Sequence, residues 1–147
     1  MNKVQYKKVS SITKFIDAIR IRVDVFIKEQ GFAVGWEPDE DDKTAIHYIA
    51  IENGMIVATA RVREMEKNEF KIERMATKKE YRGQGIGTGL INYIIGELQT
   101  RKAKRIWMQA QCQAQDFYEK CGFKPISKPF NHHGLDHIEM EYPLKNS

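Results

Sequence analysis

The stretch Glu80–Leu90 reads EYRGQGIGTGL and carries four glycines at alternate positions. Such a loop in front of a helix is suited to an anion, because a residue without Cβ lets backbone N–H groups close on a phosphate and the helix N-terminus adds partial positive charge. A bare turn needs only one or two glycines, and each glycine weakens the start of a helix by about 1 kcal/mol. We therefore expect a ligand here, with a tight strand-to-helix turn as the simpler alternative.

Two well-known nucleotide-binding patterns do not match this loop. A Walker loop requires GxxxxGK[ST], and no such string occurs in the chain. A dinucleotide fingerprint, GxGxxG, would need glycine where Thr88 or Leu90 stands. The spacing therefore excludes both classes.

The hydrophobic pattern predicts one domain over residues 1–147 with strands and helices in mixed order. Asn53-Gly54 suits a tight hairpin turn between two strands of period-two alternation, because both residues tolerate positive φ. The expected strands cover 4–9, 44–53, 55–65, 70–77, 105–111, 122–126 and 137–142. The expected helices cover about 11–29, a segment that the glycines open and that lasts to about 101, and 114–121.

Composition and charge exclude several classes of protein. With 41% hydrophobic and 30% charged residues the chain resembles a soluble globular protein, and no apolar run approaches the roughly 20 residues that cross a bilayer. The N-terminus lacks the apolar core of a signal peptide, and Cys112 and Cys121 form no disulfide framework, so we expect a cytoplasmic protein. A net charge of +4 without a concentrated basic stripe predicts no nucleic-acid partner.

One local concentration of charge is acidic, GWEPDEDDK at 35–43. We expect a solvated loop there, with a rim that attracts a cationic amine as the alternative.

RGQGIG at 82–87 matches the (Q/R)xxGx(G/A) loop, and AQDFYEKCGF at 114–123 resembles AxxFYxxxGF; both are motifs of the GNAT family of N-acetyltransferases. KIERMATKKEY at 71–81 resembles that family's fourth strand and its run-in. RIRVDVFIKEQ at 20–30 and FNHHGLDHIEM at 130–140 resemble a mostly uncharacterised bacterial branch with RxxVFxxEQ and FxxxGxxHxxM. The resemblance implies an α/β fold with a mixed, mostly antiparallel sheet, flanked by helices and splayed between the fourth and fifth strands to admit acetyl-CoA.

The resemblance also implies the residues that hold this co-substrate. The backbone of the fourth strand would pair with the pantetheine arm, the loop and helix start would hold the pyrophosphate, and a glutamine stands where relatives often have a pantetheine-binding asparagine. In chain order these residues are Met75, Ala76, Thr77, Arg82, Gly83, Gln84, Gly85, Ile86, Gly87, Thr88 and Gln111.

Two residues are candidates for proton transfer. Tyr118 falls on the tyrosine that in many relatives protonates the leaving thiolate, and with an unperturbed pKa near 10 a tyrosine is protonated at neutral pH. Glu73 lies on the same strand face as Met75 by simple alternation and could accept the amine proton, directly or through water. A salt bridge to a nearby Lys or Arg is the alternative for Glu73.

The branch-specific segments place Arg22, Glu29, Gln30 and His137 as candidates for the acceptor site, with helix capping and core hydrogen bonds as the alternative. HHGLDH at 132–137 contains three histidines and an aspartate, but structural zinc usually requires four ligands and no cysteine pair lies nearby. We therefore predict no metal.

The implied function is transfer of the acetyl group of acetyl-CoA to a primary amine of a small molecule or peptide, by direct attack in a ternary complex, in a monomer or homodimer. A covalent route is disfavoured because neither cysteine has an activating neighbour in sequence. One alternative is an acyltransferase like the acyl-homoserine lactone synthases, against which the intact RGQGIG loop argues. The other is a non-catalytic acetyl-CoA sensor, against which Tyr118 argues.

Overall fold

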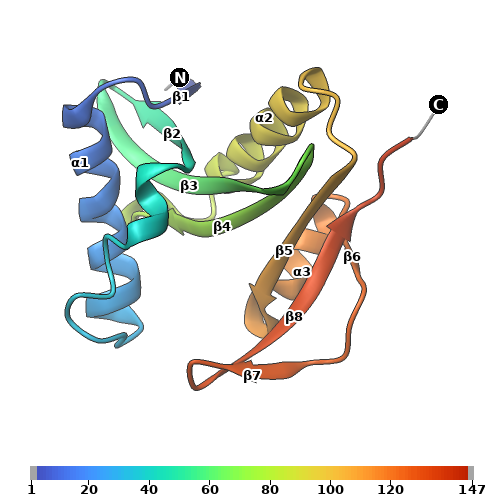
Figure 1. Cartoon of the computed structure of the whole chain (residues 1–147). Helices are drawn as coiled ribbons and strands as arrows, with labels where there is room; N and C mark the ends of the chain where they lie inside the picture. Colours follow the sequence, from blue (N-terminus) through green and yellow to red (C-terminus); the bar gives the residue numbers. More distant parts are fainter. Residues whose placement is uncertain (1–2, 146–147) are drawn as a thin grey trace.

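The computed structural model describes residues 3–145 as a mixed, mostly antiparallel sheet with helices on both faces (Figure 1). The strands run in the order β1-β2-β3-β4-β5-β8-β6, and β7 pairs with β8. The elements are β1 Val4–Lys8, α1 Ile12–Arg22, η1 Val23–Glu29, η2 Glu40–Lys43, β2 Ile46–Glu52, β3 Met55–Glu66, β4 Glu69–Thr77, η3 Lys79–Tyr81, α2 Ile86–Thr100, β5 Arg105–Gln111, η4 Cys112–Ala114, α3 Gln115–Lys120, β6 Lys124–Pro125, β7 Phe130–His132 and β8 Leu135–Tyr142.

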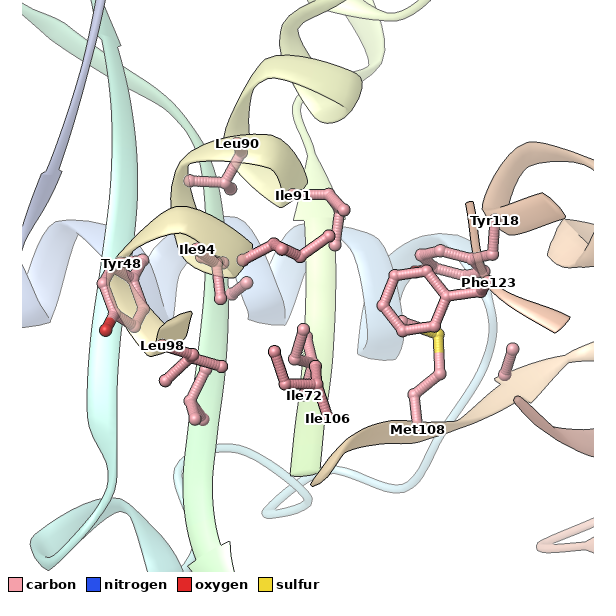
Figure 2. Close-up of a cluster of buried hydrophobic side chains, with 14 of the residues drawn as sticks. Tyr48, Ile72, Leu90, Ile91, Ile94, Leu98, Ile106, Met108, Tyr118 and Phe123 are labelled. Atoms are coloured by element: carbon pink, nitrogen blue, oxygen red, sulfur yellow. The ribbon is translucent and has the colours of Figure 1, made fainter. Parts of the chain in front are cut away.

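Two apolar cores lie on opposite faces of the sheet. The apolar stripe of α2, which includes Leu90, Ile91 and Ile94, packs on one face against strand residues such as Ile72 (Figure 2). Ala18 and Ile21 of α1 pack on the other face. The predicted hairpin is confirmed, because β2 and β3 are antiparallel and Asn53 and Gly54 between them have φ of 52° and 77°. Within residues 3–145 no helix is long and apolar enough to cross a membrane.

The predicted helix over 11–29 exists, but its second half is not α-helical. Ser11 caps α1 by accepting a hydrogen bond from the Lys14 N–H at 3.2 Å. After Arg22 the chain continues as the π-helical segment η1, which is a rare geometry found frequently at functional sites. It places Phe26 and, just after its end, Gln30 at the opening between β4 and β5.

The sheet parts between β4 and β5. The two strands pair in parallel only where Glu69, Phe70 and Lys71 face Arg105, Ile106 and Trp107. Beyond these residues they diverge, while β5 continues to pair with β8 along its other edge (Figure 1). The predicted splay is confirmed, and it leaves residues 72–77 of β4 paired on the β3 side alone.

A β-bulge in β4 changes which side chains share a face. Arg61 of β3 faces Glu73 and Thr59 faces Ala76, so β4 carries one extra residue, and Arg74 takes the left-handed φ of 54° that absorbs it. Glu73 therefore remains with Arg61, whereas Met75 packs with the α2 core. The prediction that Glu73 and Met75 share a face was wrong, because simple alternation assumes an unbroken ladder.

The acidic segment is not the solvated loop that we predicted. The side chains of Glu37 and Asp42 are 0% and 4% exposed, and both are bound by Arg22 of α1, whose side chain is 1% exposed. Arg61 of β3 adds a 2.9 Å contact to Asp42. Only part of the segment is solvated, such as the Glu40 side chain, which is 88% exposed. Buried guanidinium groups thus hold the loop against α1 and the sheet through charge-assisted hydrogen bonds.

Candidate active site

A cleft of about 270 Å³ lies where β4 and β5 part. Its walls come from β4, β5, η1, the segment that follows η1, the start of α3 and the β7–β8 hairpin. Of the predicted site residues it brings together Glu73, Met75, Gln111, Tyr118, Gln30 and His137. Clefts formed at such openings, with a few polar groups converging on them, are the usual place for a ligand.

The glycine loop lies at the end of β4 and forms the start of α2. Gly83 and Gly85 have φ of 76° and 82°, and the first hydrogen bond of the helix runs from the Gly89 N–H to the Gly85 carbonyl at 3.0 Å. The N–H groups of residues 86–88 therefore have no partner within the helix. This N-terminus can bind an anion, and the binding of a pyrophosphate by residues 82–88 stays a prediction.

The Arg82 side chain forms an ion pair within the protein, with a carboxylate of η1. Its guanidinium donates to both carboxylate oxygens of Glu29, at 2.9 and 2.8 Å, and to the Thr77 carbonyl at 3.0 Å. The hydrogen bond from Arg82 lowers the pKa of Glu29. Glu29 thus lies at the glycine loop and not along the cleft, so the structure does not place it at the acceptor site as predicted.

Arg22 is a second correction to the predicted acceptor site. Its guanidinium is enclosed by Glu37 and Asp42, with N···O distances of 2.6 and 2.8 Å, and it does not line the cleft. The alternative interpretation, a core hydrogen-bonding role, is the one that the structure shows.

Tyr118 projects from α3 into the cleft and is 8% exposed. Its ring centroid lies 5.0 Å from that of Phe117 and 6.1 Å from that of Phe123, and Figure 2 shows Tyr118 beside Phe123. Burial raises the pKa of Tyr118 above its usual 10, and the nearby Cys121 adds to this shift. The phenol therefore remains protonated at neutral pH and is available as a proton donor.

The surroundings of Cys121 do not favour a nucleophilic role. Burial raises the pKa of the Cys121 thiol, although a side-chain hydrogen bond with Thr88 opposes the shift. Because the thiolate is the reactive form, this environment disfavours a covalent route through Cys121.

Glu73 forms the ion pairs that we considered as its alternative role. Arg61, Arg63 and Lys71 surround its carboxylate, with Arg63 at 2.9 Å and Lys71 at 3.4 Å. Burial alone would raise the pKa of Glu73, but hydrogen bonds from Arg63 and the charge of Arg61 lower it to about 2. A carboxylate of such low basicity is a poor acceptor for an amine proton at neutral pH.

The other predicted polar residues meet across the mouth of the cleft. Gln111 donates a hydrogen bond from Nε2 to Gln30 Oε1 at 2.9 Å and accepts one from Gln113 at 2.7 Å. Gln111 also faces His137 across the β5–β8 ladder. The structure therefore joins the branch-specific residues Gln30 and His137 to the residue predicted to bind pantetheine.

One wall of the cleft is aromatic, and it was not predicted from the sequence. Trp36 stacks on Phe32 with centroids 4.9 Å apart, meets His133 edge-on at 4.6 Å, and has the Arg74 guanidinium 5.2 Å from its centroid. Neighbouring aromatic residues in 32–36 and the histidines of HHGLDH were the available signal, but nothing local links the two segments. Within residues 3–145 no three His, Cys, Asp or Glu side chains are grouped to hold a metal.

The parted sheet, the helix opened by glycines and the phenol between them define an acyltransferase fold. The chain belongs to the GNAT family, since residues 17–144 match the family model described as Acetyltransferase (GNAT) domain.

Relatives in bacteria agree with this assignment. A Bacillus subtilis protein provisionally named as an acetyltransferase is 32% identical, over 91% of this chain and 92% of its own length. The uncharacterized N-acetyltransferase YjcF of B. subtilis is 30% identical, over 84% and 89% respectively. The crystal structure of Escherichia coli ElaA superposes with a TM-score of 0.84 at 24% identity, covering 97% of this chain and all of that one, which shows the shared fold.

Proposed function

We propose that this protein transfers the acetyl group of acetyl-CoA to a primary amine of a small molecule or peptide, by direct attack in a ternary complex. One observation carries the proposal: β4 beyond Lys71 has no strand partner on its β5 side. This open edge lines the cleft together with Tyr118, and it ends at Thr77, a few residues before the glycine loop. The amide groups of an extended acyl-pantetheine arm can form the hydrogen bonds that a neighbouring strand would otherwise form with this edge.

The donor would be held by backbone groups and oriented by few side chains. Met75, Ala76 and Thr77 would pair with the pantetheine arm, and the N–H groups at the start of α2 would bind the pyrophosphate. Gln111 would take part through its side-chain amide at the mouth of the cleft. Arg82 is paired with Glu29, so its contribution is to brace the loop against η1 rather than to offer a free charge.

Tyr118 would donate a proton to the leaving thiolate. Attack by a neutral amine forms the C–N bond and breaks the C–S bond, and the departing thiolate needs a proton. A buried phenol held in its protonated form at the cleft can supply that proton. No covalent enzyme intermediate is required.

Two comparisons support an acetyl-CoA donor and an amine acceptor. A Bacillus anthracis protein provisionally named as a streptothricin acetyltransferase was solved in complex with acetyl coenzyme A; it is 25% identical, with a TM-score of 0.61 over 69% of this chain and 63% of its own. The name of YjcF describes N-acetyl transfer.

A panel of polyamines, amino acids, aminoglycosides, aryl amines and peptides, followed by thiol release from acetyl-CoA, tests the proposal. We expect turnover with at least one class and an amide product of the matching mass. Binding of acetyl-CoA without turnover of any amine would support the sensor alternative instead.

A further inference from the structure

We propose that His137 is the general base that accepts the proton from the acceptor amine. The inference rests on the proposed amine acetylation, because it assigns a proton acceptor to that reaction. The reaction needs a proton acceptor other than Glu73. Glu73 lines the cleft, but its carboxylate is paired with Arg61, Arg63 and Lys71.

His137 lies on the opposite face of the parted sheet from Tyr118. It pairs with Gln111 in the β5–β8 ladder, and the next pair along, Ala110 with Ile138, faces the α2 core together with Tyr118. Successive residues of a strand point to opposite faces, so His137 and Gln111 face the side where η1 and Trp36 lie. An acid on one face and a base on the other can serve the thiolate and the amine separately.

The hydrogen bond of His137 determines its tautomer. Its Nδ1 lies 3.0 Å from the Leu135 carbonyl oxygen, which can only accept, so Nδ1 carries the proton in the neutral ring and Nε2 has a free lone pair. Nε2 makes no hydrogen bond with any residue of 3–145, although the side chain is 7% exposed and lines the cleft. A fixed donor on one nitrogen and an open acceptor on the other is the arrangement that a general base requires.

The ring is also held in place by its neighbours. Phe130 stacks beside it, with centroids 6.1 Å apart and an angle of 28° between the planes. His132 meets it edge-on at 5.3 Å and 88°. These contacts restrict rotation of the ring and preserve the direction of the Nε2 lone pair.

The other charged or titratable groups around the cleft are less suited to the role. Arg74 is bound to Glu37 and Asp39, and Lys71 is paired with Glu73. His132 and His133 also line the cleft, but both are exposed on the β7–β8 hairpin. His137 is the buried imidazole among the three.

The proposed step balances without a further reactant. The amine nitrogen attacks the thioester carbonyl, forming the C–N bond and moving the carbonyl π pair to oxygen. His137 Nε2 accepts the proton that this nitrogen must lose. The carbonyl then reforms as the C–S bond breaks, the thiolate takes the Tyr118 proton, and water carries one proton from the imidazolium to the phenolate to restore both groups.

The test compares His137→Gln with the wild-type chain, using an amine that the panel identifies. We expect kcat/KM at pH 7 to fall by roughly 100-fold, at the lower end of what a general base contributes. In the wild type, log kcat/KM should rise with pH with slope two where the amine and the general base must both lose a proton, and then with slope one. The variant should show slope one throughout, because only the amine titrates.

A His132→Gln variant provides the comparison on the neighbouring ring. Loss of the slope-two region in His132→Gln, with His137→Gln behaving as wild type, would overturn the assignment. If His137→Gln does not fold, NMR titration of the wild-type imidazoles takes its place: His137 must titrate where the slope changes, and a mismatch rejects the proposal. A wild-type chain that binds acetyl-CoA but acetylates no amine contradicts the proposed function itself.

Discussion

In the proposed mechanism, proton transfer to the leaving group depends on Tyr118. We expect Tyr118→Phe to lower kcat by roughly 100-fold, because the phenol is lost while the ring still packs against Phe117 and Phe123. The dissociation constant of acetyl-CoA should change less than threefold. Tyr142→Phe is the matched control, since Tyr142 lies outside the cleft and packs near Gly122. Unchanged kcat in Tyr118→Phe would remove Tyr118 from its role.

Glu73 makes the free energy of unfolding depend on pH in the acid range. Its folded-state pKa of about 2 lies below the ordinary 4.5, so the stabilisation is fully present above about pH 5 and is lost as the pH falls toward 2. The loss is on the order of 3 kcal/mol. Asp42 acts in the same direction, because its pKa is also lowered: burial alone would raise it, and hydrogen bonds from Arg22 and from the Asp39 N–H overcome that effect.

Urea unfolding between pH 7 and pH 2.5 measures this dependence. The free energy of unfolding should fall steadily below pH 5, and Glu73→Gln should be less stable at pH 7 but show a smaller fall. Equal slopes in the two proteins would contradict the assignment of the low pKa to Glu73.

At the scale of residues, local pattern was sufficient to place Tyr118 in a short helix and the glycines before α2, but it did not predict how the charged side chains pair. Arg74 joins Glu37 and Asp39, which lie 37 and 35 positions away, and it occupies the extra position of the bulge. Contacts over such separations leave no trace in a short window of sequence. For the same reason the burial of Glu37 and Asp42 was missed.

At the scale of elements, α2 packs closely against Tyr6 of β1 because Gly89 has no side chain at this contact. A Cβ added at Gly89 would overlap the Tyr6 ring, whereas one added at Gly96 meets nothing within 4 Å. We expect Gly89→Ala to destabilise by about 1–3 kcal/mol through overpacking. Gly96→Ala, in the same helix, should stabilise by about 0.5–1 kcal/mol through helix propensity.

Thermal or urea unfolding of the two alanine variants separates these effects. Replacing Tyr6 with leucine in the Gly89→Ala background should recover part of the loss. Equal stability of Gly89→Ala and Gly96→Ala would mean that the Tyr6 contact does not restrain the helix.

Most elements follow from the sequence, and the exceptions depend on long-range pairing. The apolar stripe predicted a helix over 11–29, but it did not distinguish α-helical from π-helical geometry after Arg22. The strand expected at 122–126 is reduced to Lys124–Pro125, and β7 was not predicted. Both are short strands that exist because β8 offers them a partner.

At the scale of the whole molecule, the family motifs predicted where the donor would bind and said little about where the acceptor would bind. The splay between β4 and β5 was predicted, because the resemblance implied it. The wall of Phe32, Trp36 and His133 was not, since it forms only when the segment after η1 meets the β7–β8 hairpin. The side of the cleft that we propose for the acceptor is therefore built mainly from contacts between distant segments.

The central claim is that the cleft and glycine loop bind acetyl-CoA, and thermal unfolding with and without this compound tests it most directly. Acetyl-CoA at about 100 times its dissociation constant should stabilise the chain by roughly 2.7 kcal/mol, which corresponds to a rise in Tm of roughly 5–10 °C. NAD is the matched control and should leave Tm unchanged, because the loop does not fit the dinucleotide spacing. An unchanged Tm at millimolar acetyl-CoA would contradict the account.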